Sequence, residues 1–484
     1  MAVAVHGDRQ ISITTPLGPD VLLLVGFSGR EAISQLFDFR LDLVAANDAP
    51  VPFEALLGQP VTVALTLPSG SNRFFGGIVS RFGQGARTGR YTSYRAEVVP
   101  ALWLLTRRQS SRIFQQMSVP DILKRVLAGL DADFQLQGTF QPRDYCVQYR
   151  ETDFNFVSRL MEEEGIFYFF EHTADGHRLV VADSRQSHTD VPGGSAIVFD
   201  PTGGRKSAPG AVFQWEKDQE LRSGVVTLRD TNFQLPGSSL EAQATILDSV
   251  QVGTVTHRLR LGTNAGLELY DYPGDYAQRF DGIDPGGGEQ PGELAKILPD
   301  GVRTAAIRME QEALPSLQVS GASTARQLTP GHAFTLQGHF NADGRYVLTS
   351  VEHSAQAAHV SSGELRYTNQ FTCIPVALPY RPPRTTPSPL ISGTQTAVVV
   401  GPPGQEIFTD KYGRVKVQFH WDREGKKDAR SSCWIRVART GTGGSIVIPR
   451  IGQEAVVAFD EGDPDRPIIV GSVADARVPP LQQP

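Results

Sequence analysis

Alternation of apolar and polar side chains runs through most of this chain and most limits how it can fold. Phe37, Phe39, Leu41 and Leu43 alternate with Asp38, Arg40 and Asp42. A period of two places neighbouring side chains on opposite faces, which is typical of a half-buried β-strand. Segment 61–67 repeats the pattern, and further strands are predicted at 73–80, 91–99, 145–150, 166–171, 225–230, 333–338 and 345–352.

Two segments instead predict helices. Ser118 can cap the first, Pro120 suits its first turn, and apolar residues follow at helical spacing from 122 to 130. The second begins with Thr152 as its cap and stops at Gly165. The predicted fold class is therefore mainly β with a few helices, within the β and α+β classes.

Prolines divide the chain. Residues 375–392 contain six of them, which lack amide donors, so a sheet cannot continue there. We predict a β-rich region over 1–375, a linker over 376–392, a second domain over 393–473 and a tail over 474–484. A Gly/Pro-rich stretch at 281–292 predicts a mobile surface loop inside the first region.

The domain at 393–473 contains five short predicted strands, at 397–401, 413–421, 432–438, 453–459 and 467–473. Five twisted strands in about 80 residues suit a small closed barrel of the oligonucleotide/oligosaccharide-binding (OB) type. In the second strand Val415, Val417, Phe419 and Trp421 share one face, and Arg414, Lys416, Gln418 and His420 share the other.

Charge and cysteine content exclude several classes of protein. A net charge of −6 gives no global attraction for phosphates, so no nucleic-acid partner is expected. Cys146, Cys373 and Cys433 are isolated, which argues against a disulfide framework or a Cys-rich zinc site and favours a reducing cytosol. The early apolar run 21–27 is too short to span a bilayer, so neither a secretory signal nor stable membrane insertion is expected.

Motifs for chemistry are weak. Segment 26–30 resembles a nucleophile elbow but carries Arg30 where glycine is required. Glu162, Glu163 and Glu164 occupy consecutive helical positions about 100° apart, so they cannot converge on one ion, and they are predicted to be solvated charges.

The remaining candidates are also interpreted structurally. His332 and His339 are seven residues apart, which places them on opposite faces of a strand and disfavours a shared metal. Cys433 is predicted to be a small core residue. We therefore predict no catalytic residue, no metal site and no cofactor.

Eight blocks of sequence, in order along the chain, resemble the VgrG family of type VI secretion. They are YRETDF at 149–154, RLMEEEGI at 159–166, LYDYPG at 269–274, TSVEH at 349–353, DKYGRVKVQFHWD at 410–422, SSCWIRVA at 431–438, IPRIGQE at 448–454 and EGDPDRP at 461–467.

The resemblance implies a spike and baseplate hub with two barrel-like domains per chain, related to the hub of contractile phage tails, followed by an OB-fold neck. It implies a homotrimer on the hexameric tube protein Hcp, in contact with baseplate proteins and carrying effector and adaptor proteins. Such a protein is not an enzyme. It assembles in the cytoplasm and is then secreted through the apparatus into target cells or the medium without a signal peptide.

In one respect the chain departs from typical family members, which continue into a β-helix shaft capped by a PAAR-repeat protein. Residues 474–484 cannot supply the stacked repeats of a β-helix. We therefore expect the shaft to be missing or truncated, and a PAAR partner only if a shaft follows.

Candidate residues for a subunit interface lie in the OB domain. Trp421 and Trp434 belong either to the barrel core or to a contact between subunits, where aromatic residues and arginine are enriched. The polar face of the second strand is a candidate for the three-fold contact or the hub–neck junction. The candidates are Arg414, Lys416, Gln418, His420, Trp421 and Trp434.

Three alternatives remain open from the sequence. Within contractile systems, the chain could be the tail hub of a phage or of an extracellular injection system. A cell-wall hydrolase spike would need two carboxylates in a cleft. An OB module that binds nucleic acid or glycan would need a basic groove with exposed aromatics.

Overall fold

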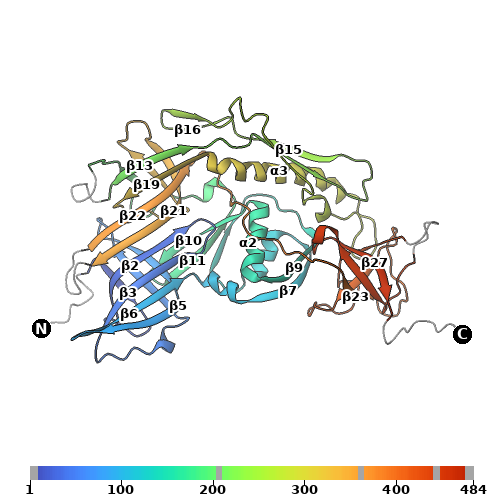
Figure 1. Ribbon diagram of the computed structural model, residues 1–484, viewed down its shortest axis with the longest axis horizontal. Coiled ribbons are helices and arrows are strands. Elements are labelled where there is room, and N and C mark those ends of the chain that lie inside the picture. The colour runs from blue at the N-terminus through green and yellow to red at the C-terminus, as the bar shows by residue number, and fades with distance from the viewer. Residues whose placement is uncertain (1–8, 203–209, 358–364, 440–446, 475–484) are drawn as a thin grey trace.

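Strands dominate the molecule, as the sequence predicts (Figure 1). The computed structural model describes residues 9–202, 210–357, 365–439 and 447–474, so most of the predicted tail lies outside the described residues. The α-helices of the described part are α1 (Val119–Val126), α2 (Asp153–Glu164) and α3 (Ile297–Ala313). Short 3₁₀ turns occur at Phe53–Ala55, Ala101–Arg107, Arg185–Ser187, Ala277–Arg279, Leu294–Lys296, Leu314–Ser316 and Asp460–Gly462.

The first barrel-like half is built from N-terminal strands. In sheet order they are β1 (Ile11–Thr14), β4 (Pro60–Thr66), β5 (Asn72–Arg87), β6 (Tyr91–Val99), β3 (Asp38–Ala46) and β2 (Leu23–Ala32). The alternation predicted for β3 is confirmed: Phe39, Leu41 and Leu43 are buried, while the residues between them are exposed. Inward-facing side chains of this half form one apolar core with α1 and α2.

The second half continues the same sheet, because β21 (Gly344–Ala357) pairs antiparallel with β2. Its core centres on Phe334, Tyr346 and Phe371. The other strands are β22 (Leu365–Pro375), β19 (Leu317–Ser323), β13 (Val212–Gln219), β20 (Ala333–Gln337) and β12 (Ala196–Val198).

Helices α1 and α2 lie in the middle of the molecule and begin as predicted. The hydroxyl of Ser118 accepts a hydrogen bond from the amide of Asp121, and that of Thr152 from the amide of Asn155. Gly165 ends α2 in the left-handed conformation. The strands around them are β7 (Gln109–Met117), β8 (Ala132–Gln135), β9 (Arg143–Thr152), β10 (Phe167–Thr173) and β11 (Gly176–Ala182).

An outer layer contains α3, which the sequence analysis did not predict. Pro299 and Gly301 lie in its first turns, where they weaken the helical signal. Gly301 is needed because a Cβ there would lie 2.7 Å from the ring of Tyr276. The outer strands are β14 (Val225–Asp230), β15 (Leu240–Thr245) and β18 (Glu268–Asp271), with a hairpin of β16 (Ser249–Val252) and β17 (Val255–Arg258).

The C-terminal barrel has the five strands expected of an OB fold. In sheet order they are β24 (Lys416–Phe419), β23 (Gln395–Val400), β26 (Glu454–Phe459), β27 (Pro467–Val473) and β25 (Arg436–Val437). A bridge between Val415 and Ile435, just outside β24 and β25, closes the ring. Val415, Val417 and Phe419 point into its core, which confirms the predicted face.

The proline-rich segment 376–392 forms neither helix nor strand, and no described helix is long and apolar enough to cross a membrane. Helix α2 and strand β9 lie between the large sheet and the C-terminal barrel (Figure 1). This arrangement places them at the boundary where the two regions meet.

Candidate functional site

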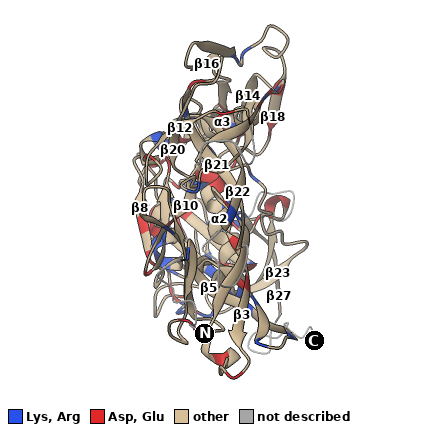
Figure 2. Ribbon diagram, turned by 90° about the vertical axis from the view of Figure 1, so that its left-hand side faces the viewer, with Lys and Arg blue, Asp and Glu red and all other residues tan. Residues whose placement is uncertain are grey.

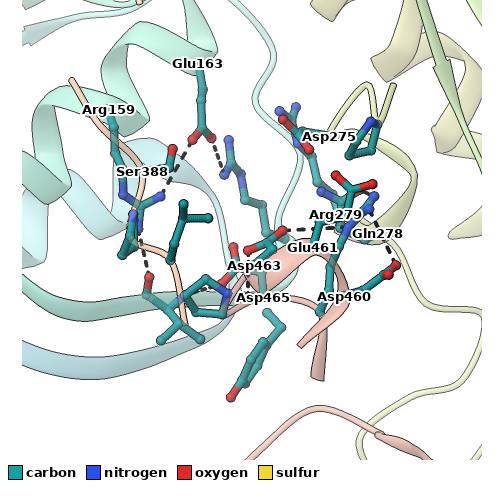
Figure 3. Close-up of a pocket in the computed structure, with 18 of the residues that line it drawn as sticks. Arg159, Glu163, Asp275, Gln278, Arg279, Ser388, Asp460, Glu461, Asp463 and Asp465 are labelled. Atoms are coloured by element: carbon teal, nitrogen blue, oxygen red, sulfur yellow. Dashed lines mark hydrogen bonds and ion pairs between the residues drawn. The ribbon is translucent and has the colours of Figure 1, made fainter. Parts of the chain in front are cut away.

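A charged cleft of about 310 Å³ lies where the C-terminal barrel meets the rest of the chain (Figure 3). It is lined by β9 and α2, by the proline-rich segment near Ser388, and by the turn 460–466 between β26 and β27. Arginines and carboxylates face one another across it: Arg143, Arg159, Arg279, Arg384 and Arg466 with Glu163, Asp271, Asp275, Asp460, Glu461, Asp463 and Asp465. We call this region the hub–barrel junction.

The junction also has an apolar core beside the charged cleft. Tyr145 and Val147 of β9 are buried and belong to the same hydrophobic cluster as Val417 and other core residues of the barrel. The backbone amide of Val147 donates a hydrogen bond of 2.6 Å to Oδ1 of Asp465 in the barrel turn. Separating the barrel from the hub would expose this shared core to water.

Of the three consecutive glutamates of α2, Glu162 and Glu164 are buried and Glu163 is partly buried among arginines, so the prediction that they are solvated charges is wrong. Glu162 accepts hydrogen bonds of 3.0 Å from the amides of Thr385 and Thr386. Arg143 pairs with Glu163 at 2.8 Å and also with Glu164. The cause is tertiary: β9, α3 and the proline-rich segment all pack around α2.

Burial and nearby charges shift the pKa values of carboxyl groups in the cleft in opposite directions. Burial favours a higher pKa for Glu163, but Arg143 and Arg159 outweigh it and lower the pKa to about 2. For Asp463, burial dominates and raises the pKa to about 6 despite Arg466. Burial, and then the charge of Asp463, also raises the pKa of Asp465. One carboxylate is thus held ionised while two others resist ionisation.

A second attachment joins the barrel to the segment 281–292. Arg414 contacts both carboxylate oxygens of Asp281, at 2.6 and 2.9 Å, and its Nε donates to Asp410 at 2.6 Å. Asp281 and Ile283 are buried, and Trp434 donates its indole hydrogen to the carbonyl oxygen of Asp284 at 2.8 Å. The surface-loop prediction is wrong for this part of the segment, because the barrel covers it.

Two more interface candidates are engaged within the chain. Lys416 is 1% exposed, its ammonium lies 4.8 Å from the centre of the Trp434 ring, and burial lowers its pKa. Gln418 is buried, where its Nε2 donates to the carbonyl oxygens of Asp422 and Gly425. Arg414, Lys416 and Gln418 of the polar face are therefore covered by other parts of this chain.

The remaining candidates differ in exposure. Trp434 is buried, whereas Trp421 is half-buried, stacks on Phe419 with ring centres 5.1 Å apart, and donates to Gln395 at 2.9 Å. His420 keeps 58% of its side chain exposed and lies 3.1 Å from Glu454. Of the six candidates, His420 is exposed, Trp421 is half-buried and the other four are buried, and their place at a subunit contact stays a prediction.

Sequence reasoning missed a second buried polar cluster, in the core of the hub. Glu31 pairs with Arg73 and accepts from Nε2 of His353 at 2.9 Å, while Nδ1 of His353 lies 2.8 Å from the hydroxyl of Tyr367. These groups fasten β2 to β21 and β22 by side chains as well as backbone. The signal in the sequence was His353, which ends the TSVEH block.

The groups at the junction are suited to holding the barrel and the hub together. Within the described ranges, no group of three or more His, Cys, Asp or Glu side chains is arranged to hold a metal ion. Cys433 is buried, which raises the pKa of its thiol and disfavours the reactive thiolate. The junction instead combines ion pairs, backbone hydrogen bonds and a shared apolar core.

Comparison with known proteins agrees with this architecture. Residues 30–359 match the family described as phage tail baseplate hub (GPD), and residues 407–473 match the type VI secretion system/phage-baseplate injector OB domain. A solved type VI secretion component of E. coli, described as structurally similar to the phage T4 tail proteins gp27 and gp5, shares the fold. Its TM-score is 0.62 at 22% identity, over 96% of this chain and 100% of that one.

Two curated relatives are closer in sequence. The type VI secretion system spike proteins VgrG1c and VgrG1a of Pseudomonas aeruginosa are 41% and 42% identical to this chain, and each match covers 97% of this chain. The chain spans 62% of the length of the first and 70% of the second. On these grounds the chain belongs to the VgrG family of type VI secretion spike proteins, with a baseplate-hub region and an OB-fold domain.

Proposed function

We propose that this chain is a non-enzymatic structural hub at the base of a type VI secretion spike. Three copies form a ring that sits on the Hcp tube, contacts baseplate proteins and carries effector or adaptor proteins. The protein assembles in the cytoplasm and leaves with the tube through the apparatus. A PAAR-repeat tip protein is a partner only where a shaft continues from the barrel.

One observation carries this proposal: the hub and the barrel share a core. Tyr145 and Val147 of the hub pack among the barrel's inward-facing residues. Arg414 and Asp281 add a buried ion pair with two contacts. A push on the hub is therefore transmitted to the barrel through packed side chains, which suits a protein that carries an axial load.

The alternative of an OB module that binds nucleic acid or glycan fits less well. Such a module needs an open basic groove. Here Arg414 and Lys416 are buried against the hub and against Trp434, so these cations cannot reach a ligand. The alternative of a cell-wall hydrolase is disfavoured because Glu163 is paired with Arg143, while Asp465 and Glu162 accept hydrogen bonds from backbone amides.

Two measurements test the proposal. Light scattering on the purified chain is expected to give the mass of three copies, and a stable monomer at micromolar concentration would argue against a ring. In cells, Arg414→Ala is expected to reduce the Hcp released into the medium, because it leaves Asp281 unpaired at the junction. Arg95→Ala is the matched control, since Arg95 lies on the exposed face of β6. Equal Hcp release from both variants would contradict a load-bearing junction.

A further inference from the structure

A second cavity, separate from the charged cleft, opens on another face of α2 and has a volume of about 300 Å³. Its lining residues from α2 are Phe154, Ser158, Met161 and Glu162. The last three follow the first by four, seven and eight residues, which is the spacing of one helix face. Arg159 and Glu163 line the charged cleft instead, because each lies one position, about 100°, further round the helix.

Three other segments complete the cavity. They are the loop 34–36 between β2 and β3, Ile166 and Tyr168 where β10 begins, and Pro382, Thr385 and Thr386 of the proline-rich segment. The loop is tied to β10, since the amide of Ser34 donates to the carbonyl oxygen of Tyr168 at 2.7 Å. Helix α2 and strand β10 lie beside each other in the middle of the molecule, in Figure 1 and in Figure 2 alike. The walls of the cavity therefore belong to packed parts of the fold.

Two buried hydroxyl groups at this cavity have no hydrogen-bond partner among the described residues. They belong to Tyr168 and Ser158, which are 2% and 9% exposed and both line the cavity. Burial raises the pKa of Tyr168, and the nearby hydroxyl of Tyr380 and carboxylate of Glu162 raise it further, so the Tyr168 hydroxyl lies close to that carboxylate. A buried hydroxyl without a partner is costly, so these two groups point to a bound polar molecule.

The charge of the cavity comes from Glu162. Among the described residues that line the cavity it is the one charged side chain, and its carboxylate accepts from uncharged donors. These are the amides of Thr385 and Thr386, both at 3.0 Å, and the hydroxyl of Thr386 at 2.6 Å. Its neighbours Glu163 and Glu164 are each paired with an arginine. The cavity therefore keeps a net negative charge, which favours a cationic ligand.

The polar groups match one kind of cation. A primary ammonium has three N–H donors and no acceptor. The carboxylate of Glu162 and the hydroxyls of Tyr168 and Ser158 are three groups that can each accept one of these hydrogen bonds. A guanidinium carries five donors in a rigid plane, which three acceptors do not satisfy. The rest of the lining offers apolar surface for an alkyl chain, from Leu36, Phe154, Met161 and Ile166.

We propose that this cavity binds a primary ammonium carried on an alkyl chain, with the ammonium held by Glu162, Tyr168 and Ser158. Two sources share this chemistry: a free alkyl amine, and the lysine side chain of a protein bound to the hub. The inference goes beyond the proposed function, because the site needs neither the ring nor the junction. Its failure would leave the proposed hub function as it stands.

The test is a titration of the whole purified chain at pH 7, followed by NMR signals of the added compound. The compounds are n-butylamine, n-butanol and a lysine capped at both ends. Butylamine is expected to bind about 10- to 100-fold more tightly than butanol, which has the same alkyl chain without the charge. If the capped lysine also binds, the cavity is open to a protein's side chain, and if butylamine alone binds, it takes free amines. Butylamine that binds no more tightly than butanol overturns the proposal.

Variants locate the bound amine. Glu162→Gln is expected to weaken butylamine binding about 10- to 100-fold. Glu352→Gln is the matched control, because Glu352 is exposed on β21 outside the cavity and the change removes the same charge, and it is expected to bind like the wild type.

Tyr168→Phe guards against a folding defect in Glu162→Gln, since it removes only a hydroxyl that has no partner in the described chain. It is expected to weaken butylamine binding about 2- to 10-fold without lowering the temperature of thermal unfolding. If Glu162→Gln and Tyr168→Phe both bind butylamine as tightly as the wild type, the amine binds elsewhere on the chain and the proposal is overturned.

Discussion

The two boundaries inside this molecule are built from different interactions. The halves of the hub are joined mainly by backbone pairing of β2 with β21, from Gly26↔Gln356 to Ala32↔Ser350, with the buried Glu31–His353 contact as an addition to it. The hub–barrel junction is joined by side chains: Tyr145 and Val147 in the shared core, and ion pairs around Arg143 and Arg414. A backbone ladder tolerates changes of side chain and of pH, whereas a side-chain junction depends on both.

This difference has a consequence for load. A load on the boundary between β2 and β21 is shared by the seven residue pairs of their ladder. The junction instead depends on a few buried charges, each of which is costly to leave unpaired. We therefore expect the junction to be the boundary that single substitutions weaken first.

The largest effect is expected from Arg143→Ala. This arginine contacts Glu163 and Glu164, and all three side chains are largely buried. Its removal takes one arginine from each carboxylate, which leaves Glu164 with Arg303 at 2.6 Å and Glu163 with Arg159 at 3.7 Å, and should lower the free energy of unfolding by about 3 kcal/mol. Urea unfolding followed by the fluorescence of the four tryptophans measures it.

Its control is Arg95→Ala. Arg95 pairs with Asp42 at 3.5 Å, but its side chain is 88% exposed. The loss should stay below about 1 kcal/mol. Equal losses from the two variants would mean that the junction is no more sensitive than the surface of the hub.

A smaller effect is expected from Arg414→Lys. Lysine keeps the charge but cannot contact both oxygens of Asp281 in the plane of a guanidinium, nor stack on Phe233, whose ring centre lies 5.1 Å from Arg414. We expect a loss of about 1–2 kcal/mol in urea unfolding. Arg450→Lys, on an exposed pair with Glu406, should change almost nothing. If Arg414→Lys left the free energy of unfolding unchanged, the charge alone would be shown to hold the barrel.

The pH dependence of the junction gives a third test. Burial raises the pKa of Asp463 to about 6 from an ordinary value of 3.8, so the folded state holds this proton more tightly than the unfolded chain. That preference stabilises the fold below about pH 4 and is lost as the pH rises through about 6. Asp463→Asn should remove this loss of stability. With allowance for the partial exposure of Asp463, we expect the free energy of unfolding at pH 7 to rise by about 1 kcal/mol.

The pKa shift of Glu163 has the opposite sign to that of Asp463. Its pKa is lowered to about 2, so its contribution is present above its ordinary value of 4.5 and is lost as the pH falls toward about 2. The wild-type junction should therefore be most stable near about pH 4 to 5. Urea unfolding from pH 3 to pH 8 measures both slopes, and an unchanged slope in Asp463→Asn would contradict the assignment.

The smallest effect is expected from His420→Ala. This side chain is mostly exposed and faces Glu454 at the barrel surface. The free energy of unfolding of the single chain should change by less than about 0.5 kcal/mol. A larger loss at concentrations where the ring forms, and not in the monomer, would support the prediction that His420 lies at a subunit contact.

Local patterns in the sequence sufficed for many of the strands, for α1 and α2, and for the family, but not for α3. Alternation in β3 and β24 fixed which side chains enter the cores, and Ser118, Thr152 and Gly165 fixed the ends of α1 and α2. The division of the chain at 376–392 remains a prediction, and the barrel's core does not follow it, because β9 contributes Tyr145 and Val147 from far upstream.

Only the tertiary structure decided which charged side chains are buried and which partner each of them has. Nothing in the spacing of Glu162, Glu163 and Glu164 distinguishes a solvated helix face from a buried one, and nothing near Asp281 announces Arg414 as its partner 133 residues away. Periodicity reports how one element divides its side chains between two faces, since that depends on local geometry. Which face is then covered, and by which distant segment, depends on packing between elements, and so does the pairing of every buried charge.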